Sequence, residues 1–290
     1  MRNIFLHPML YLIPLLVLGT EQREFQIGPI QEDLRIISLS GFLTEMLFEL
    51  GYGEQIVARD VTSTYPAAAH ALPNLGHVTQ LNAEAILQAQ PDYVFVEKSQ
   101  WAQAEALRQL EGSGIKIVQV PTSRHLKNAI YAATHISKHL QLPEDKFLQL
   151  KEQIETDSLA LQEVLAQYSA RPSVLFIYAR GTNRILVGGS NTDAAAMIEK
   201  AGGRNAIQSF DNFRALSPEA LIEASPEVIL MFESGLASLD GKEGLALVPG
   251  ISHTPAFQNN RIIAMDGHYL MAFGPRVGKA ALDLSHHIHQ

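Results

Sequence analysis

One sequence pattern occurs in both halves of this chain, and it restricts the possible folds more than any other feature. Residues 81–96 read LNAEAILQAQPDYVFV and residues 216–231 read LSPEALIEASPEVILM, so matching residues recur at a constant offset of 135 positions. In each copy a capping residue, Asn82 or Ser217, opens a short helix that stops before a proline. The apolar run that follows is typical of a buried parallel strand. The repeat therefore predicts two similar α/β halves.

The repeat extends to the segments on both sides of these stretches. We expect strands at 35–39, 56–58, 93–96 and 114–120 in the first half, and at 173–178, 228–232 and 261–265 in the second. Helices are expected at 44–50 and 193–201, with Thr44 and Asp193 as N-caps and Gly51 and Gly202 as C-caps. This alternation indicates an α/β fold with two Rossmann-like lobes and mainly parallel sheets.

A helical segment without glycine joins the two halves. Apolar residues at helical spacing predict one helix at 125–140 and a longer one at 146–168. Such a helical connector is rigid. Ligands of open α/β sheets bind outside the carboxyl ends of the strands. We therefore expect a ligand cleft between the lobes. The expected divisions are a signal peptide at 1–20, a first lobe at 33–124, the connector at 125–170 and a second lobe at 171–285.

The first twenty residues are typical of an export signal. Arg2 precedes an apolar stretch at 4–18, and the small residues Gly19 and Thr20 come before charged residues. We expect cleavage near residue 20 and a periplasmic protein; the alternative is an uncleaved N-terminal anchor. Because the chain has no cysteine, it has no site for lipid attachment there, and we expect that it is not a lipoprotein.

Composition excludes several classes of function. A net charge of −8 without a basic run argues against nucleic acid as the partner, because phosphate binding needs clustered Lys and Arg. The lack of cysteine removes thiol catalysis and Cys zinc sites, and H-E-x-x-H and G-x-S-x-G motifs are absent from the sequence. These features favour a binding protein over an enzyme, and we expect it to be monomeric.

The loop after the strand at 56–58 reads RDVTSTYP and supplies a candidate metal ligand. Its large side chain is Tyr65, and a phenolate oxygen is a hard anionic ligand that suits ferric iron, including the iron of haem. The positive charge of Arg59 would favour that anionic form. The alternative is a loop aromatic that simply packs on Pro66.

Further candidates lie in the second half. Arg276 follows a Gly-Pro turn after the last expected strand, where a guanidinium can bind a carboxylate through two hydrogen bonds. His268 and Tyr269 in the same segment are spare candidate ligands. Arg180 comes directly after the strand at 173–178 and can meet a second anionic group. The alternatives are a surface salt bridge for Arg276 and a solvated loop position for Arg180.

Glu84 and Glu219 occupy the same position of the repeat, in the first turn of each short helix. The helix dipole favours acidic residues there, which is a sufficient structural explanation. The functional alternative is one exposed carboxylate per lobe for a partner with two-fold symmetry.

Together these motifs identify a resemblance to the substrate-binding proteins of the vitamin B12 and siderophore class of ABC importers. The strings RDVTSTYP, LPNLGHVTQLNAEAIL, VGGSNTDAAAMIEKAGGRNAI and DGHYLMAFGPR are more narrowly similar to periplasmic haem-binding proteins. The resemblance covers roughly residues 35 to 285. It implies that haem is the transported ligand, with Tyr65 as axial iron ligand and Arg276 near a propionate. It also implies that Glu84 and Glu219 dock on arginines of a permease dimer, which acts with an ATPase.

This sequence departs from the resemblance at one position. Some members carry a histidine ligand in the loop after the second lobe's first strand, whereas residues 178–181 here read YARG. The prediction is therefore a single tyrosine ligand, Tyr65, with five-coordinate iron or an unidentified sixth partner. Two other functions stay open: a binder of a ferric siderophore or cobalamin, for which Trp101 is the sole tryptophan, and a metal-dependent two-lobed enzyme.

Overall fold

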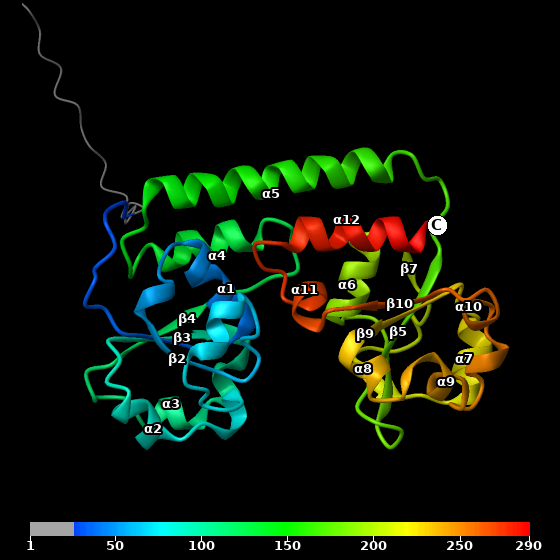
Figure 1. Cartoon of the computed structure of the whole chain (residues 1–290), viewed down its shortest axis with the longest axis horizontal. Coiled ribbons are helices and arrows are strands. Elements are labelled where there is room, and N and C mark those ends of the chain that lie inside the picture. Colours follow the sequence, from blue (N-terminus) through cyan, green and yellow to red (C-terminus); the bar gives the residue numbers. More distant parts are fainter. Residues whose placement is uncertain (1–25) are drawn as a thin grey trace, which may run out of the picture.

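Two α/β lobes lie side by side beneath one long helix that extends over both (Figure 1). The computed structural model describes residues 26–290, so the expected signal peptide at 1–20 lies outside the described residues. The expected α/β class, with two lobes and a helical connector, is confirmed. None of the helices between residues 26 and 290 has the length and apolar character needed to cross a membrane.

The first lobe is built on a four-stranded parallel sheet with the order β2-β1-β3-β4. Its strands are β1 (Ile36–Ser38), β2 (Ile56–Arg59), β3 (Tyr93–Glu97) and β4 (Lys116–Val120), and its helices are α1 (Gly41–Glu49), α2 (Ala83–Gln88) and α3 (Glu105–Arg108). β1 and β3 are almost wholly buried, because helices cover both faces of the sheet. Because the four strands are parallel, their carboxyl ends all lie at the same edge of the sheet. β1 lies in the interior of the sheet, with β2 on one side and β3 on the other.

The second lobe is built on a six-stranded mixed sheet with β10-β9-β5-β6-β8 in order and β7 paired with β5. Its strands are β5 (Ser173–Ala179), β6 (Ile185–Gly188), β7 (Arg204–Asn205), β8 (Phe213–Ala215), β9 (Val228–Phe232) and β10 (Ile262–Met265). Its helices are α6 (Asp193–Lys200), α7 (Pro218–Ala224), α8 (Glu233–Ala237), α9 (Gly241–Ala246), α10 (Pro255–Gln258), α11 (Gly267–Met271) and α12 (Val277–Ile288). The antiparallel strands β6 and β8 were not expected from the sequence.

The repeat is present in the three-dimensional structure. β7 pairs in parallel with β5 as β2 pairs with β1, and β9 and β10 then correspond to β3 and β4. Gln90 and Ser225, at matching positions after α2 and α7, both have a left-handed backbone. Gly51 and Gly202 end α1 and α6 with positive φ, which confirms them as the expected helix ends. The β6 and β8 strands are thus an addition to the second copy.

Two expected N-caps are wrong by one to four residues. α1 is capped by Ser40, whose hydroxyl accepts a hydrogen bond from the amide of the third helical residue, and Thr44 lies inside the helix. α6 is capped in the same way by Thr192, so that Asp193 is its first residue. Extended backbone at Ser40 and Thr192 aims each side chain back at the free amides, which a residue already in helical conformation cannot do.

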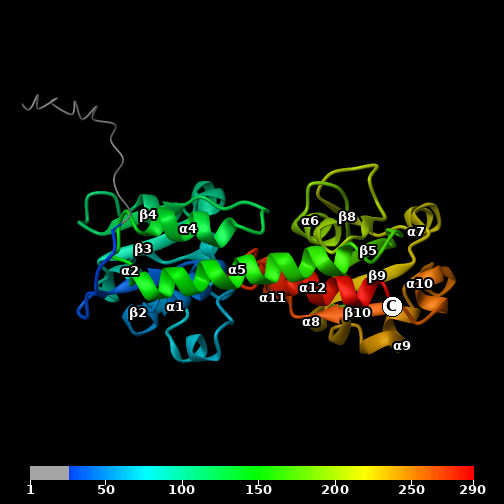
Figure 2. The ribbon, with the colours of Figure 1, turned by 90° about the horizontal axis from the view of Figure 1, so that it is seen from above.

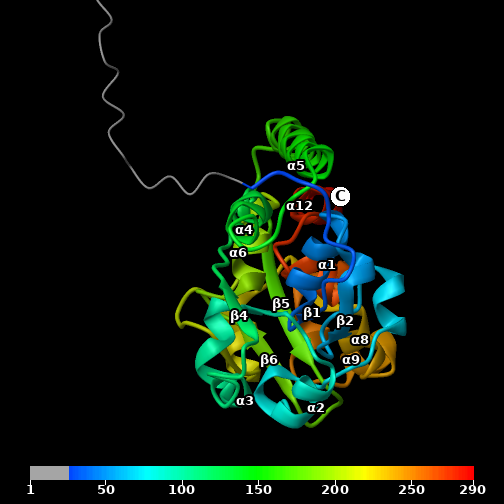
Figure 3. The ribbon, with the colours of Figure 1, turned by 90° about the vertical axis from the view of Figure 1, so that its left-hand side faces the viewer.

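The connector consists of α4 (Asn128–Ile136) and α5 (Glu144–Leu165). α5 packs along α12 and spans both lobes (Figures 2 and 3). Leu150 and Ile154 belong to the core of the first lobe, whereas Leu161 belongs to a core of the second. One continuous helix therefore shares its buried residues between the two lobes, which makes the connection rigid.

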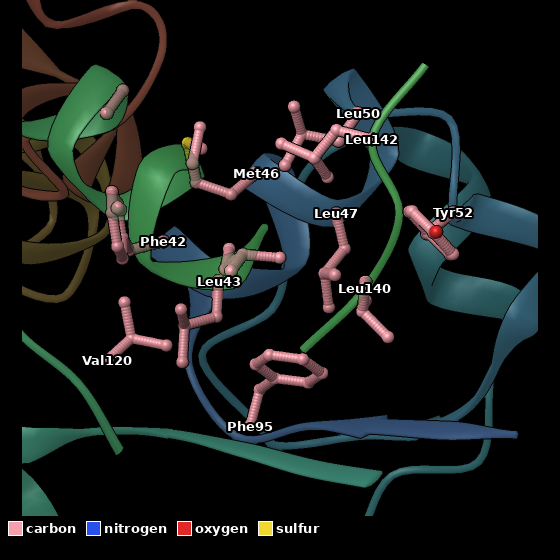
Figure 4. Close-up of a cluster of buried hydrophobic side chains, with 14 of the residues drawn as sticks. Phe42, Leu43, Met46, Leu47, Leu50, Tyr52, Phe95, Val120, Leu140 and Leu142 are labelled. Carbon is pink, nitrogen blue, oxygen red and sulfur yellow. The ribbon is translucent and has the colours of Figure 1, made fainter. Parts of the chain in front are cut away.

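Apolar side chains of α1 pack toward the first sheet (Figure 4). Phe42, Leu43, Met46 and Leu47 are buried there against Phe95 of β3. Truncation of one such leucine to alanine costs about 2–5 kcal/mol of stability. This packing fixes the position of α1, and α1 carries one of the charged residues described next.

Candidate functional site

A buried polar cluster holds the loop that follows β2. The carboxylate of Asp60 accepts hydrogen bonds from the hydroxyls of Thr62 and Ser63, each at 2.6 Å. The hydroxyl of Thr44 in α1 lies 2.7 Å from that of Ser63 and donates to Ser38 of β1 at 2.8 Å. Because strand, helix and loop share one network, the segment leading to Tyr65 has a fixed course.

Arg59 supports the same loop from its other side. Its guanidinium is buried and donates to the carbonyl oxygens of Ala69 at 2.8 Å and Asp60 at 2.9 Å. These bonds join the end of β2 to the turn that comes after Tyr65. The structure therefore places Arg59 beneath the loop and not on the phenol ring.

Tyr65 lies where the two lobes meet, and its side chain stacks with Arg276 of the second lobe. The guanidinium carbon of Arg276 is 3.5 Å from the centre of the Tyr65 ring. Tyr65 is nevertheless 36% exposed, so the ring is covered on one side and accessible elsewhere. Burial acts to lower the pKa of Arg276, but the hydrogen bond and charge of Glu45, with a smaller electrostatic effect of Tyr65, raise this pKa above its ordinary value.

Glu45 of α1 holds Arg276 in this position. Its carboxylate accepts two hydrogen bonds from the Arg276 guanidinium, from Nε at 2.7 Å and from Nη2 at 3.0 Å. Glu45 is only 2% exposed, yet it is charged: burial acts to raise the pKa of Glu45, but hydrogen bonds from His268 and Arg276 lower it below the ordinary value. A paired, buried carboxylate thus links the first lobe to the second. Glu45 is not among the candidate residues that the sequence patterns predict.

His268 and Tyr269 are brought near this site but are already engaged. Nε2 of His268 lies 2.7 Å from Oε2 of Glu45, and the His268 side chain is buried. The Tyr269 hydroxyl donates to Asp283 at 2.7 Å. Burial, the bond to Asp283 and its charge raise the pKa of Tyr269 well above the usual range. Both side chains are therefore bonded to other protein residues, and neither is free to bind a metal or another ligand.

Arg180 stands apart from this group, at the carboxyl end of β5. Its side chain is exposed and its guanidinium carbon lies 5.7 Å from the centre of the Tyr178 ring. Tyr178 also packs against Phe213 of β8 and Phe232 of β9, with ring centres 6.3 Å and 6.0 Å apart. This aromatic group, defined here as Tyr178, Phe213 and Phe232, was missed because its members come from three separate strands.

A second link between the lobes fixes the backbone before Arg276. The side chain of Asn128 in α4 is buried, and its amide nitrogen donates to the carbonyl oxygen of Phe273 at 3.2 Å. Its amide oxygen accepts from the backbone and hydroxyl of Ser123. The connector therefore holds the Gly-Pro-Arg turn at the lobe junction, where Phe273 has a left-handed backbone.

A pocket of about 340 Å³ opens beside this junction. Its lining combines Phe48, Glu49 and Pro66 of the first lobe with Pro275 and Arg276 of the second, and α5 closes it with Lys146, Gln149, Leu150 and Gln153. Arg276 thus borders open space, and so does Pro66, the residue after Tyr65.

The chain is similar to the proteins of one known family. A family model described as periplasmic binding protein matches residues 36–269, which includes both sheets and the lobe junction up to Tyr269. The chain belongs to the periplasmic binding protein family. Proteins of this family bind substrates for transport, and membership places the chain outside the cytoplasmic membrane.

Solved structures similar to this periplasmic binding protein include two haem-binding proteins. RhuT from Roseiflexus sp. RS-1 is 35% identical, with a TM-score of 0.80 over 89% of this chain and 98% of RhuT. HutB of Vibrio cholerae is 29% identical, with a TM-score of 0.77 over 89% of this chain and 100% of HutB. The vitamin B12-binding protein of Photorhabdus laumondii subsp. laumondii is 24% identical over 87% of this chain and 86% of that protein.

Glu84 and Glu219 lie far from the junction in this periplasmic binding protein. Both side chains are exposed, in the first turns of α2 and α7, and the N-caps Asn82 and Ser217 are confirmed by bonds to backbone amides of those turns. In Figure 1 the two helices lie in separate lobes, both below α5. The structure thus exposes one carboxylate of this pair on each lobe.

The residues considered for other ligands are placed differently. Trp101 is partly buried against the core of the first lobe. Its carbonyl oxygen accepts a hydrogen bond from the side chain of Arg108. Within residues 26–290, no group of three or more His, Asp or Glu side chains is arranged to hold a metal ion.

Proposed function

We propose that this periplasmic binding protein captures ferric haem at Tyr65 and delivers it unchanged to an ABC permease of the inner membrane. One observation carries the proposal: an exposed tyrosine at the lobe junction is stacked on an arginine that a buried glutamate holds in place. The similarity to the haem-binding proteins RhuT and HutB supports the same ligand.

Tyr65 is the proposed axial ligand. A phenolate is among the protein groups that hold haem iron, and the Arg276 guanidinium is stacked on this ring. Two of the guanidinium nitrogens of Arg276 already donate to Glu45, so we assign Arg276 to Tyr65 rather than to a propionate. Arg59, His268 and Tyr269 are then positioning residues, since each has a bond to protein in place.

The second lobe supplies the proposed contacts for the porphyrin. Tyr178, Phe213 and Phe232 offer aromatic surface at the carboxyl edge of the sheet, suited to a flat apolar macrocycle. Arg180 is the exposed cation beside them, so we assign it to a haem propionate. Iron coordination and propionate recognition would then come from different lobes.

Delivery requires a partner, and Glu84 and Glu219 are its proposed contacts. One exposed carboxylate on each lobe fits a permease dimer that offers an arginine from each protomer and works with an ATPase. We further propose that the signal peptide is cleaved near residue 20, that the mature protein is a monomer without a lipid anchor, and that residues 33–124 and 171–285 act as the two lobes.

An absorbance titration with ferric haem tests the proposal. We expect the mature protein to give a saturable Soret band with a charge-transfer feature of tyrosinate coordination, and Tyr65→Phe to lose that feature and weaken binding at least about a hundredfold. Tyr131→Phe is the matched control, because it removes the phenol of an exposed tyrosine in α4 that the proposed site does not use, and it should keep the wild-type spectrum.

The same titration has outcomes that contradict the proposal. An unchanged spectrum in Tyr65→Phe would remove Tyr65 as the ligand. If wild-type protein does not bind haem saturably, haem is not the substrate. Cobalamin and a ferric siderophore, the alternatives of this class, would then be titrated by tryptophan fluorescence of Trp101.

A further inference from the structure

Each lobe exposes one large aliphatic side chain at the same position of the repeat. Leu87 in α2 is 47% exposed and Ile222 in α7 is 74% exposed, and they are separated by the repeat offset of 135 residues. Single exposed aliphatic residues are common on protein surfaces. The same exposure at both copies of one position needs a cause that acts on both lobes.

The helices hold these side chains outward. Ile86 and Leu221, the residues just before them, are buried in the lobe cores and fix the rotation of each helix. Leu87 and Ile222 therefore point to solvent. Each follows an exposed glutamate by three residues, and residues at this spacing share one face of a helix. Both lobes thus present a carboxylate and an aliphatic group side by side.

We propose that Leu87 and Ile222 are apolar anchors of the surface that docks on the permease. The inference rests on the proposed function and deepens it. The occupant is the outer face of a permease dimer, in which each protomer offers a basic side chain next to an apolar depression. The charge is complementary, because α2 and α7 contain glutamates and no lysine or arginine.

The two kinds of side chain make different contributions to such an interface. Exposed carboxylates steer the approach and set the register, whereas removal of aliphatic surface from water provides affinity. The second lobe has a further exposed aliphatic residue, Leu247, at the end of α9. The turn at Gly250, three residues later, lies against Pro218 and Leu221 of α7, so Leu247 belongs to a segment that packs on the same helix as Ile222.

The test is a double substitution in the full mature chain, Leu87→Ser with Ile222→Ser. Binding is measured to the cognate permease–ATPase complex in lipid nanodiscs, by biolayer interferometry, with haem-free protein. We expect at least about tenfold weaker binding. The matched control is Leu148→Ser with Leu159→Ser, two exposed leucines of α5, which should keep wild-type affinity for the complex. Both double variants should bind haem like the wild type.

Three results would overturn the inference. Wild-type docking affinity in Leu87→Ser/Ile222→Ser would exclude the anchors, and an equal loss in the α5 control would show a general effect of surface polarity. Sedimentation that shows a wild-type dimer and a monomeric variant would make a second copy of this chain the occupant. Failure of the proposed function is seen separately, as absent haem binding by the wild-type protein, because docking is measured without haem.

Discussion

At the scale of single residues, charge pairing at the lobe junction decides what Tyr65 can do. Glu45 is buried, and its two partners come from the other lobe, 223 and 231 positions along the chain. Tyr65 and Arg276 meet only because Glu45 aims the guanidinium at the ring. A glutamate in this place therefore affects both the stability of the fold and the ligand site.

We predict that Glu45→Gln weakens haem binding and changes how the free energy of unfolding depends on pH in the acid range. Because the pKa of Glu45 in the folded protein lies below its ordinary value of 4.5, its stabilising effect is complete above pH 4.5 and is lost as pH falls through the folded-state value. The wild type should thus lose stability below pH 4.5 more steeply than the variant. At pH 7 the variant should be about 3 kcal/mol less stable, as measured by urea unfolding.

Glu49→Gln is a useful comparison, because the pKa of Glu49 is shifted in the direction opposite to that of Glu45. Burial and the charge of Glu45 raise the pKa of Glu49, so its ionised form is disfavoured in the folded protein at neutral pH. Its neutralisation should leave stability at pH 7 unchanged or slightly increased. A parallel loss in both variants would show that any change of charge on α1 is harmful and would contradict the specific role of Glu45.

Sequence patterns predicted that Tyr65 and Arg276 lie at the carboxyl edges of the sheets, but they did not single out Glu45. Tyr65 and Arg276 each follow a strand in a loop, where local sequence predicts a position at the carboxyl edge of the sheet. Glu45 stands inside a helix, where a glutamate is unremarkable, and its partners are remote in the sequence. Arg59 shows the converse: proximity along the chain suggested a contact with Tyr65, whereas backbone carbonyls bind its guanidinium.

At the scale of elements, α1 approaches both the Tyr65 loop and α11 at its first residue. A Cβ atom added at Gly41 would lie 2.5 Å from Nδ1 of His268 and 2.6 Å from the carbonyl oxygen of Thr62. No real side chain fits at these distances, so the close approach of loop, helix and second lobe requires glycine at this position.

We predict that Gly41→Ala lowers stability by about 1–3 kcal/mol, since the added methyl group must displace His268 or the loop. Haem affinity should fall as well, because His268 and Arg276 share Glu45. Thermal unfolding and the haem titration measure both effects. Gly235→Ala in α8 is the control: its nearest contact would be an ordinary 3.4 Å, and alanine favours helix. Equal destabilisation of both variants would refute the packing argument.

The elements of the repeat were predictable because local signals reinforce one another there: a cap, an apolar face, a stop and a buried strand. β7 and β8 lack such signals. β7 has only two residues, and all residues of β8 are exposed, so neither shows the alternation or apolar run by which strands are detected. Pairing with β5 and β6 creates these strands, and pairing is not encoded in a local pattern.

At the scale of the whole molecule, several side-chain contacts tie the first lobe and the connector to the second lobe. Arg124 binds Asp193 of α6 at 2.6 Å, Asn128 binds the carbonyl oxygen of Phe273, and Glu45 binds Arg276. α5 adds its shared burial in both cores. These links resist the hinge motion by which two-lobed proteins commonly close.

We predict that haem binding changes the radius of gyration by less than about 1 Å in small-angle X-ray scattering. Ser158→Pro, placed in α5 between Ile154 and Leu161, should break the helix and allow a larger change, because proline removes a hydrogen bond and clashes with the preceding turn. If the variant shows the same small change as the wild type, α5 is not the element that restrains the lobes.

The matched side chains on α2 and α7 have a consequence for the kinetics of encounter. A two-fold symmetric partner presents identical receptors, so a protein with equivalent contacts on its two lobes can be received in either of two poses related by a half-turn. Both poses would be productive, which doubles the orientations from which a diffusing molecule can engage. Tyr65, however, occurs in one lobe alone, so the cargo would face a different permease protomer in each pose, and release must be possible from both.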